Sequence, residues 1–254
     1  MYEPPDGTPQ HNCDYETHSV CIADARHLPP SPSVDDAGFE LWSAPSAVTD
    51  FRDDQAVRCV YYDECADLAR IVTGGTRAYV FDHQVRKREA GRPTLTFGRQ
   101  GDGSKPGAAG RIHNDYTDAS GRRRLALVLG GADAARAVRD YCIVNIWRSI
   151  AGPVEDTPLG LCDARSIASA DLRACEIRYP SRNGEIYLLS HSPRHRWYYY
   201  SRMDRHEALV FKQFDSRAGD IARFVPHTAF DLPNISPRAP LRKSIEVRCL
   251  VVME

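Results

Sequence analysis

Short stretches in which apolar and polar residues alternate dominate this chain, and they predict β-strands. In an extended strand the side chains at i and i+2 lie on one face, and β-branched and aromatic residues favour such strands. Asn183-Gly184 is a strong signal for a hairpin turn between strands on either side of it. The predicted strands cover 19–24, 39–42, 56–61, 77–85, 142–147, 177–179, 185–189, 197–200, 208–211 and 242–252.

Helical spacing is confined to two stretches. Residues 62–73 have apolar side chains on one helical face and are followed by Gly74-Gly75, a typical helix stop. A second helix is expected from about 131 to 141, with alanines and Val138 along one side. Many short strands with few helices predict a mainly β protein, a sandwich or open barrel with helices packed outside it.

Two segments show no such pattern. The first 17 residues are rich in Pro, Asn, Asp and Gly and predict an irregular arm. Residues 86–110 carry many charges and glycines and predict a long loop, of the kind that often forms a lid. A length of 254 residues fits one large β domain as well as two small ones.

The composition of the chain bears on which kind of partner it binds and in which cellular compartment it is found. A net charge of −1 gives no reason to expect a nucleic acid or a membrane as partner, and Arg122-Arg123-Arg124 is interpreted as a solvated turn. The 8 cysteines form no C-x-x-C pair and several lie in apolar runs, as free thiols do in a reducing compartment. The chain begins without an apolar signal segment, so a cytoplasmic location is expected.

The candidate chemistry starts at Ile112-His113-Asn114-Asp115. On a strand, His113 and Asp115 project from the same face, which supplies two of the three ligands in the two-histidine, one-carboxylate triad of non-heme Fe(II) sites. The alternative is a surface turn, because such triplets often arise by chance. His227, after a Phe-Val-Pro run, is the best third ligand, although a histidine in a capped loop is an alternative.

The last predicted strand offers an anion-binding face. Alternation places Arg242, Ser244, Glu246 and Arg248 on one side of it. An arginine fork beside a hydroxyl group is well suited to a carboxylate. An ion pair between Arg242 and an acidic neighbour is the alternative.

Segments along nearly the whole chain resemble one family in order. The chain is similar to Fe(II)/2-oxoglutarate oxygenases with a double-stranded β-helix (jelly-roll, cupin-like) fold. More narrowly, it resembles the hydroxylase/desaturase family that includes AsaB-like enzymes, gibberellin desaturase and the CmcJ methoxylation component. The matching segments are 38–41, 80–83, 113–117, 145–148, 158–166, 195–199, 211–216, 226–230 and 242–248.

The resemblance implies a role for some of these residues. His113, Asp115 and His227 would bind Fe(II), and Arg242 with Ser244 would hold the distal carboxylate of 2-oxoglutarate, with O2 as the second co-substrate. Leu241 and Lys243 depart from the residues expected in relatives, which leaves Arg238 as a rival of Arg242. Candidates that are equally compatible with purely structural roles are Asn145, for the C1 carboxylate of 2-oxoglutarate, and Arg148, His83 and Trp147, for substrate.

The expected domain organisation follows from the same resemblance. Residues 1–254 would form a single oxygenase domain, with an N-terminal arm and outer strands over 1–50, a β-helix core with helices over 51–254 and a lid loop over 86–110. The expected activity is hydroxylation, desaturation or cyclisation of a small molecule in secondary metabolism, with release of succinate and CO2. A metal-dependent hydrolase or isomerase and a non-catalytic partner subunit are the alternatives. A homodimer or a pathway partner protein is left open.

Overall fold

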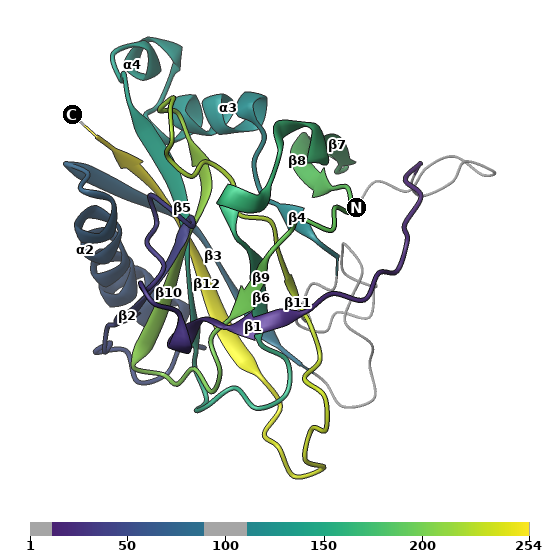
Figure 1. The fold of residues 1–254 in the computed structure, drawn as a ribbon. Coiled ribbons are helices and arrows are strands. Elements are labelled where there is room, and N and C mark those ends of the chain that lie inside the picture. Colours follow the sequence, from purple (N-terminus) through teal and green to yellow (C-terminus); the bar gives the residue numbers. More distant parts are fainter. Residues whose placement is uncertain (1–11, 89–110, 254) are drawn as a thin grey trace.

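The computed structural model describes residues 12–88 and 111–253, which form two β-sheets that pack face to face with helices outside them (Figure 1). The five-stranded sheet is antiparallel throughout and has the order β2-β10-β5-β12-β3. Its strands are β2 (Phe39–Ser43), β10 (Glu207–Asp215), β5 (Tyr141–Ser149), β12 (Lys243–Val252) and β3 (Arg77–Lys87). The prediction of a mainly β protein with flanking helices is confirmed.

The seven-stranded sheet consists of shorter strands in the order β1-β9-β6-β11-β4-β8-β7. Its pairs are antiparallel except for β1 beside β9. The strands are β1 (Ile22–Asp24), β9 (Trp197–Tyr199), β6 (Leu159–Cys162), β11 (His227–Ala229), β4 (His113–Asn114), β8 (Asn183–Leu189) and β7 (Leu172–Arg178). Short 3-10 turns are η1 (Ala25–His27), η3 (Ala164–Ser166) and η4 (Ser169–Asp171).

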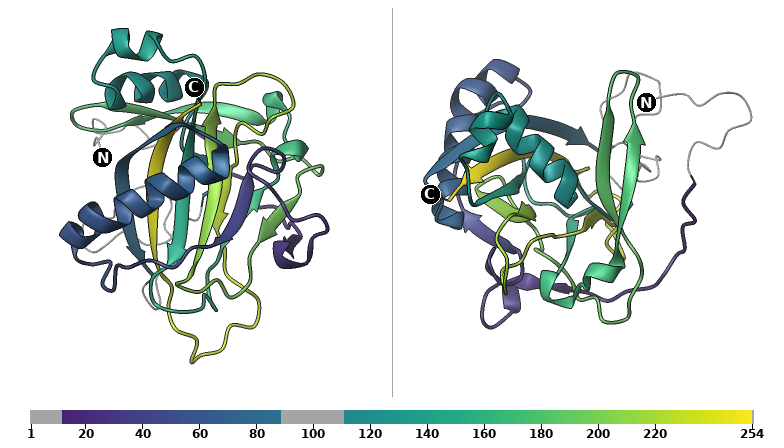
Figure 2. Two further views of the ribbon diagram at one scale, coloured as in Figure 1. Left: turned by 90° about the vertical axis from the view of Figure 1, so that its left-hand side faces the viewer. Right: turned by 90° about the horizontal axis from the view of Figure 1, so that it is seen from above.

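Helix α2 (Tyr62–Thr73) covers the outer face of the five-stranded sheet (Figure 2). Its buried residues Cys65 and Ala69 pack against alternate residues of β5, β10 and β12. The helix ends at Gly74, whose φ of +70° places it in the left-handed region that favours glycine. The predicted helix over 62–73 and its glycine stop are therefore confirmed.

The strand predicted at 56–61 is wrong, because this stretch is helical. Asp53 caps α1 (Asp54–Ala56) by accepting hydrogen bonds from two backbone N–H groups, and the chain continues as the π-helical turn η2 (Val57–Tyr61) into α2. Val57 and Tyr61 are four residues apart and both are buried. The side chains that suggested a strand therefore form one face of a helix.

The inner face of the five-stranded sheet forms two clusters. Near the metal-ligand candidates, Trp147, Leu209 and Phe211 pack against Leu161 and Val225 from the side of the other sheet. At the far end, Ile143, Phe214 and Leu250 pack against helix α3, which with α4 lies at the top of Figure 1.

Helix α3 (Asp118–Val128) was not expected from the sequence. Thr117 caps it in a reciprocal arrangement with Ser120, so Arg122, Arg123 and Arg124 lie on a helix and the predicted turn is wrong. Helix α4 (Ala132–Arg136) is shorter than the helix predicted over 131–141.

The predicted hairpin forms between β7 and β8, but its turn lies earlier than expected. The N–H of Tyr179 donates to the carbonyl of Arg182, while Asn183 and Gly184 already belong to β8. The loop predicted over 86–110 begins later than expected, because Arg86 and Lys87 belong to β3, and residues 89–110 lie outside the described residues.

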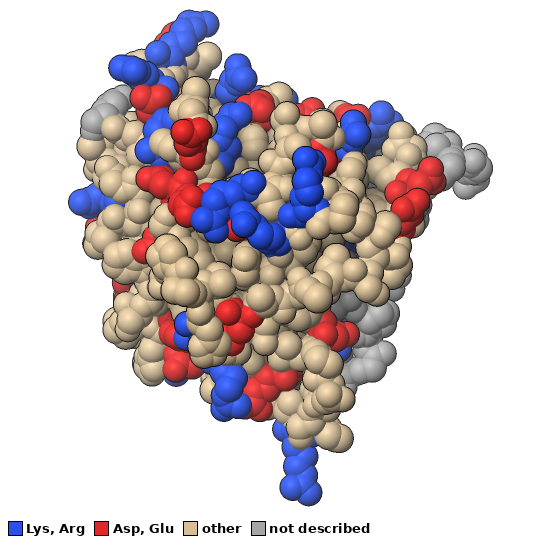
Figure 3. All heavy atoms as spheres, viewed as in Figure 1, with Lys and Arg blue, Asp and Glu red and all other residues tan. Residues whose placement is uncertain are grey.

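Two further features concern the surface. On the face drawn in Figure 3, acidic and basic side chains are interspersed, and neither sign covers a whole side of it. None of the helices within 12–88 and 111–253 has both the length and the apolar character needed to cross a membrane.

Candidate metal centre

Two short neighbouring strands bring the candidate ligands together. His227 on β11 is the direct cross-strand partner of His113 on β4, and their ring centroids are 4.6 Å apart. Asp115 follows two residues after His113, and its Oδ1 lies 3.4 Å from the Nε2 of His113. One ligand atom from each of the three residues lies within 4.8 Å of the other two. This spacing and donor set fit a divalent metal bound by two histidines and one carboxylate.

Backbone carbonyls orient both imidazole rings. The Nδ1 of His113 lies 2.8 Å from the carbonyl oxygen of Arg111, and that of His227 lies 3.2 Å from the carbonyl oxygen of Val225. A carbonyl only accepts hydrogen bonds, so each Nδ1 carries the proton and each Nε2 keeps its lone pair. Burial, reinforced by the neighbouring His113, lowers the pKa of His227 to about 3. The neutral, metal-binding form of this ring is therefore favoured.

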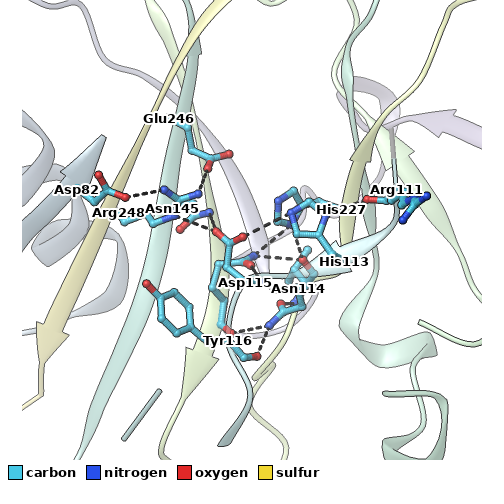
Figure 4. Close-up of polar contacts among 12 residues, drawn as sticks. Asp82, Arg111, His113, Asn114, Asp115, Tyr116, Asn145, His227, Glu246 and Arg248 are labelled. Atoms are coloured by element: carbon cyan, nitrogen blue, oxygen red, sulfur yellow. Dashed lines mark hydrogen bonds and ion pairs between the residues drawn. The ribbon is translucent and has the colours of Figure 1, made fainter. Parts of the chain in front are cut away.

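Asp115 is held by three polar groups (Figure 4). Its Oδ2 accepts hydrogen bonds from the Nε of Arg248 at 3.0 Å and from the Nδ2 of Asn145 at 2.9 Å. Its backbone N–H donates to the Oε1 of Gln213 at 2.7 Å. Burial acts to raise the pKa of Asp115, but the positive charge of Arg248 opposes it, and the pKa lies well below its usual value. The group is therefore an anion near neutral pH.

A small cavity opens beside the histidines. Arg242 is 4% exposed, and its Nη1 donates to the carbonyl of Thr157 at 2.9 Å. The Nε of Arg242 and the Oγ of Ser244 are buried without a hydrogen-bond partner, and an unpartnered buried polar group is costly. The cavity is lined by Arg86, His113, Trp147, Leu159, His227, Thr228, Ala229, Arg242 and Glu246.

Burial, together with the positive charge of nearby Arg86, lowers the pKa of Arg242 to about 10. Arg86 is opposite Ser244 in the β3–β12 ladder, and Arg86 lines the cavity together with Arg242. The unpartnered Nε of Arg242 and hydroxyl of Ser244, with the positive charge of Arg86 nearby, are the chemistry that receives a carboxylate. The alternative for Arg242, an ion pair in place of ligand binding, leaves its Nε unexplained.

Several other predicted residues lie elsewhere. Arg148 is on the opposite face of β5 from Asn145 and Trp147, where its Nε donates to the hydroxyl of Tyr61 beneath the helical layer. His83 is on the corresponding face of β3, and its Nδ1 shares a hydrogen bond of 2.8 Å with the hydroxyl of Tyr62. Strand alternation turns both away from the cavity, so the expectation that they contact substrate is corrected here.

The remaining two candidates differ in position. Arg238 is exposed on the loop before β12, so it does not share the cavity with Arg242. Asn145 donates one N–H of its amide to Asp115, and its carbonyl oxygen has no hydrogen-bond partner. Because an amide nitrogen has a second N–H, the expected contact of Asn145 with the C1 carboxylate stays a prediction.

Three polar residues that shape the centre were not assigned roles from the sequence. Gln213 lies at a register shift in β10, where the ladder with β5 skips one residue and turns the amide toward Asp115. Asn114 is fully buried and bonds to the backbone of Tyr116, Gln213 and Val225. The sequence signal for Gln213 was its place beside Lys212 as a polar pair within the apolar run 208–214. The third residue, Arg248, was visible only as part of the polar face of the last predicted strand.

Comparisons with known proteins define the class. The family model described as "Oxidoreductase/YMDC permease-like domain" matches residues 1–252. Hydroxylase/desaturase efuI of Hormonema carpetanum is 31% identical over 94% of this chain and 85% of its own, and hydroxylase/desaturase CTB9 of Cercospora beticola is 32% identical over 94% and 78%. The Fe(II)/2-oxoglutarate-dependent dioxygenase nvfI of Aspergillus novofumigatus (strain IBT 16806) is 32% identical over 98% of this chain and 88% of its own.

The solved structure of the iron and alpha-ketoglutarate-dependent endoperoxidase NvfI superposes with a TM-score of 0.86 at 30% identity, covering 99% of this chain and 92% of that one. Fold and centre thus define an Fe(II)/2-oxoglutarate-dependent oxidoreductase with a cupin-like jelly roll, as the sequence indicated. Within that class, the chain belongs to the Oxidoreductase/YMDC permease-like domain family, together with these hydroxylase/desaturase enzymes.

Proposed function

We propose that this enzyme hydroxylates, desaturates or cyclises a small molecule of secondary metabolism, with His113, Asp115 and His227 as its Fe(II) ligands. Arg242 and Ser244 hold the distal carboxylate of 2-oxoglutarate in this proposal. The observation that carries it is that two buried polar atoms lack a hydrogen-bond partner. They are Arg242 Nε, which belongs to a residue of the cavity wall just before β12, and Ser244 Oγ, near the start of that strand. A dicarboxylate that reaches from the metal to these atoms satisfies both.

The protein's own residues position the reactants. The two Nε2 atoms and one carboxylate oxygen leave the other positions of the metal for ligands. When bound, Fe(II) and 2-oxoglutarate supply an O2-dependent oxidation of the substrate with release of succinate and CO2. Trp147 and Leu159 give the cavity apolar walls, which exclude water and strengthen the attraction between Arg242 and an anion.

The alternative of a hydrolase or isomerase explains the metal ligands but not the second anion site. A metal-bound water is sufficient for hydrolysis, and it gives no role to Arg242 Nε and Ser244 Oγ. A non-catalytic partner subunit likewise gives no role to imidazoles whose Nδ1 atoms are fixed so that both Nε2 atoms keep their lone pairs. The oxygenase accounts for both sets of groups.

A small-molecule substrate and a single domain complete the proposal. The relatives named above are enzymes with hydroxylase, desaturase and endoperoxidase names, and the family model runs through residues 1–252 without a break. The net charge of −1, with both signs interspersed on the face drawn in Figure 3, gives no reason to expect a nucleic acid or a membrane as partner. The described residues include all eight cysteines, and these form no disulfide, which supports a reducing, cytoplasmic location.

The test is Fe(II)-dependent succinate formation in wild type, His113→Ala and the control His206→Ala. His206 is an exposed histidine, so His206→Ala makes the same histidine-to-alanine change without touching the metal centre. We expect succinate formation to be abolished in His113→Ala and unchanged in His206→Ala. Turnover of 2-oxoglutarate at the wild-type rate by His113→Ala would refute the assignment, and product formation without O2 would favour the hydrolase or isomerase.

A further inference from the structure

One oxygen of Asp115 is already saturated. A carboxylate oxygen has two lone pairs in the carboxylate plane, and Oδ2 accepts from both Arg248 Nε at 3.0 Å and Asn145 Nδ2 at 2.9 Å. The other oxygen, Oδ1, faces the imidazole of His113 at 3.4 Å. The residue therefore presents a single oxygen to a metal between the histidines.

Arg248 is itself fixed by carboxylates on three sides, as Figure 4 shows. Its Nε bonds to Asp115, its Nη1 to Asp82 at 2.9 Å and its Nη2 to Glu246 at 2.9 Å. Each nitrogen of the planar guanidinium has its own acceptor, so any rotation of the group breaks at least one of these hydrogen bonds. A register shift between β12 and β3 follows directly after Arg248 and marks a local break in the ladder beside the site.

We propose that Arg248 and Asn145 are positioning residues that restrict Asp115 to one-oxygen ligation of the metal. This inference rests on the proposed function. Both residues act on the same atom, Oδ2, one as a charged donor and one as a neutral donor. Each donates to Asp115, and neither is one of the three residues whose ligand atoms lie within 4.8 Å of one another.

The restriction fixes the number of positions left for reactants. Two imidazoles and one carboxylate oxygen leave three positions on a six-coordinate ion, which suffice for a two-atom chelating co-substrate and O2. If Asp115 bound through both oxygens, one of these positions would be lost. Arg248 and Asn145 therefore hold open the position that the co-substrate or O2 requires.

The test uses substitutions that conserve charge, because removing the charge of Arg248 would itself change attraction of a cation. Arg248→Lys keeps the charge but loses the planar fork. Asn145→Leu removes the neutral donor, and since the Oδ1 of Asn145 has no hydrogen-bond partner, it breaks no other bond of the amide oxygen. Arg217→Lys is the matched control, because it disrupts a comparable guanidinium–carboxylate fork with Asp215 in a separate cluster.

The readouts are Co(II) affinity by calorimetry, the visible spectrum of the Co(II) complex and urea unfolding of the metal-free protein. Loss of a group that orients a metal ligand typically weakens binding by ~10–100-fold. We expect such a loss, with an altered Co(II) spectrum, in Arg248→Lys and Asn145→Leu. The control should keep the wild-type affinity and spectrum even if its unfolding midpoint falls.

The double variant Arg248→Lys/Asn145→Leu gives a second measurement. Because both donors act on one oxygen, we expect its loss of Co(II) affinity to be smaller than the product of the single losses. Wild-type affinity and spectrum in both single variants would overturn the positioning role. Failure of the wild type to bind Co(II) or to form succinate would instead overturn the proposed function, so the two failures are distinguishable.

Discussion

Replacing Arg242 by Met should weaken the binding of 2-oxoglutarate far more than it weakens the fold. The side chain is 4% exposed, its guanidinium carbon lies 5.7 Å from the Trp147 ring centroid, and its Nε has no hydrogen-bond partner. In the folded protein it makes one side-chain hydrogen bond, from Nη1 to the carbonyl of Thr157. Loss of that bond costs about 1 kcal/mol of stability.

The cost to co-substrate binding is larger because an ion pair is lost. Truncating one partner of a buried, hydrogen-bonded charge pair costs about 2–5 kcal/mol. A loss of about 2–5 kcal/mol corresponds to a roughly 30- to 4,000-fold increase in Kd, at 1.4 kcal/mol for each factor of ten. Arg242→Lys should fall between wild type and Arg242→Met, because the ammonium keeps the charge but not the second donor.

Calorimetric titration of Mn(II)-loaded protein with 2-oxoglutarate in the absence of O2 measures this Kd without turnover. Arg238→Met is the control, since it removes the same charge from an exposed position of the loop before β12. It should leave Kd within about twofold of wild type. An unchanged Kd in Arg242→Met, or a large increase in Arg238→Met, would show that the distal carboxylate is held elsewhere.

Three further outcomes follow from the structure. Asn114→Ala should lower the free energy of unfolding by about 2–4 kcal/mol in urea titrations, because it leaves the backbone groups of Tyr116, Gln213 and Val225 without their buried partner; a loss below about 1 kcal/mol would contradict this. Gly121→Ala should cost about 1–3 kcal/mol by the same assay, since its Cβ would lie 2.8 Å from the ring of Phe214, whereas a neutral effect would mean that the ring moves freely. The metal-free protein should lose stability as pH falls from about 6.5 toward about 3, because the lowered pKa of His227 means that the unfolded chain binds a proton at higher pH than the folded chain. His227→Gln should reduce the dependence of the unfolding free energy on pH by up to about 1.4 kcal/mol per pH unit. An unchanged pH dependence in this variant would refute the role of His227.

Residues 113–117 and 242–248 illustrate what local pattern can predict. Strand alternation predicted that His113 and Asp115 lie together and that Arg242 and Ser244 share a face. The first pair is close in space and the second is buried, although Asp115 and Arg242 each lie one residue outside a strand. The cross-strand contact between His113 and His227 depends on strand order, which the local pattern did not predict; the resemblance to a family implied only that both residues bind the metal.

The misses have physical causes as well. The run 56–61 contains valines and a tyrosine that suit a strand, but the Asp53 cap and the continuation into α2 determine a helix there. Gln213 enters the site through a register shift, and no side-chain pattern reports the position of a bulge. Arg148 and His83 were assigned by neighbourhood in sequence, whereas the face on which each lies depends on which side of its sheet meets α2.

The two faces of strand β5 have different roles. Asn145 and Trp147 face the metal centre and its cavity, whereas Val144 and Ile146 face the helical layer. Substitution of Asn145 or Trp147 therefore changes the support of Asp115 or the inner core together with the cavity. Substitution of Val144 or Ile146 changes packing beneath α2 and leaves the residues around the metal ligands unaltered, so scaffold stability can be varied on one strand separately from the site.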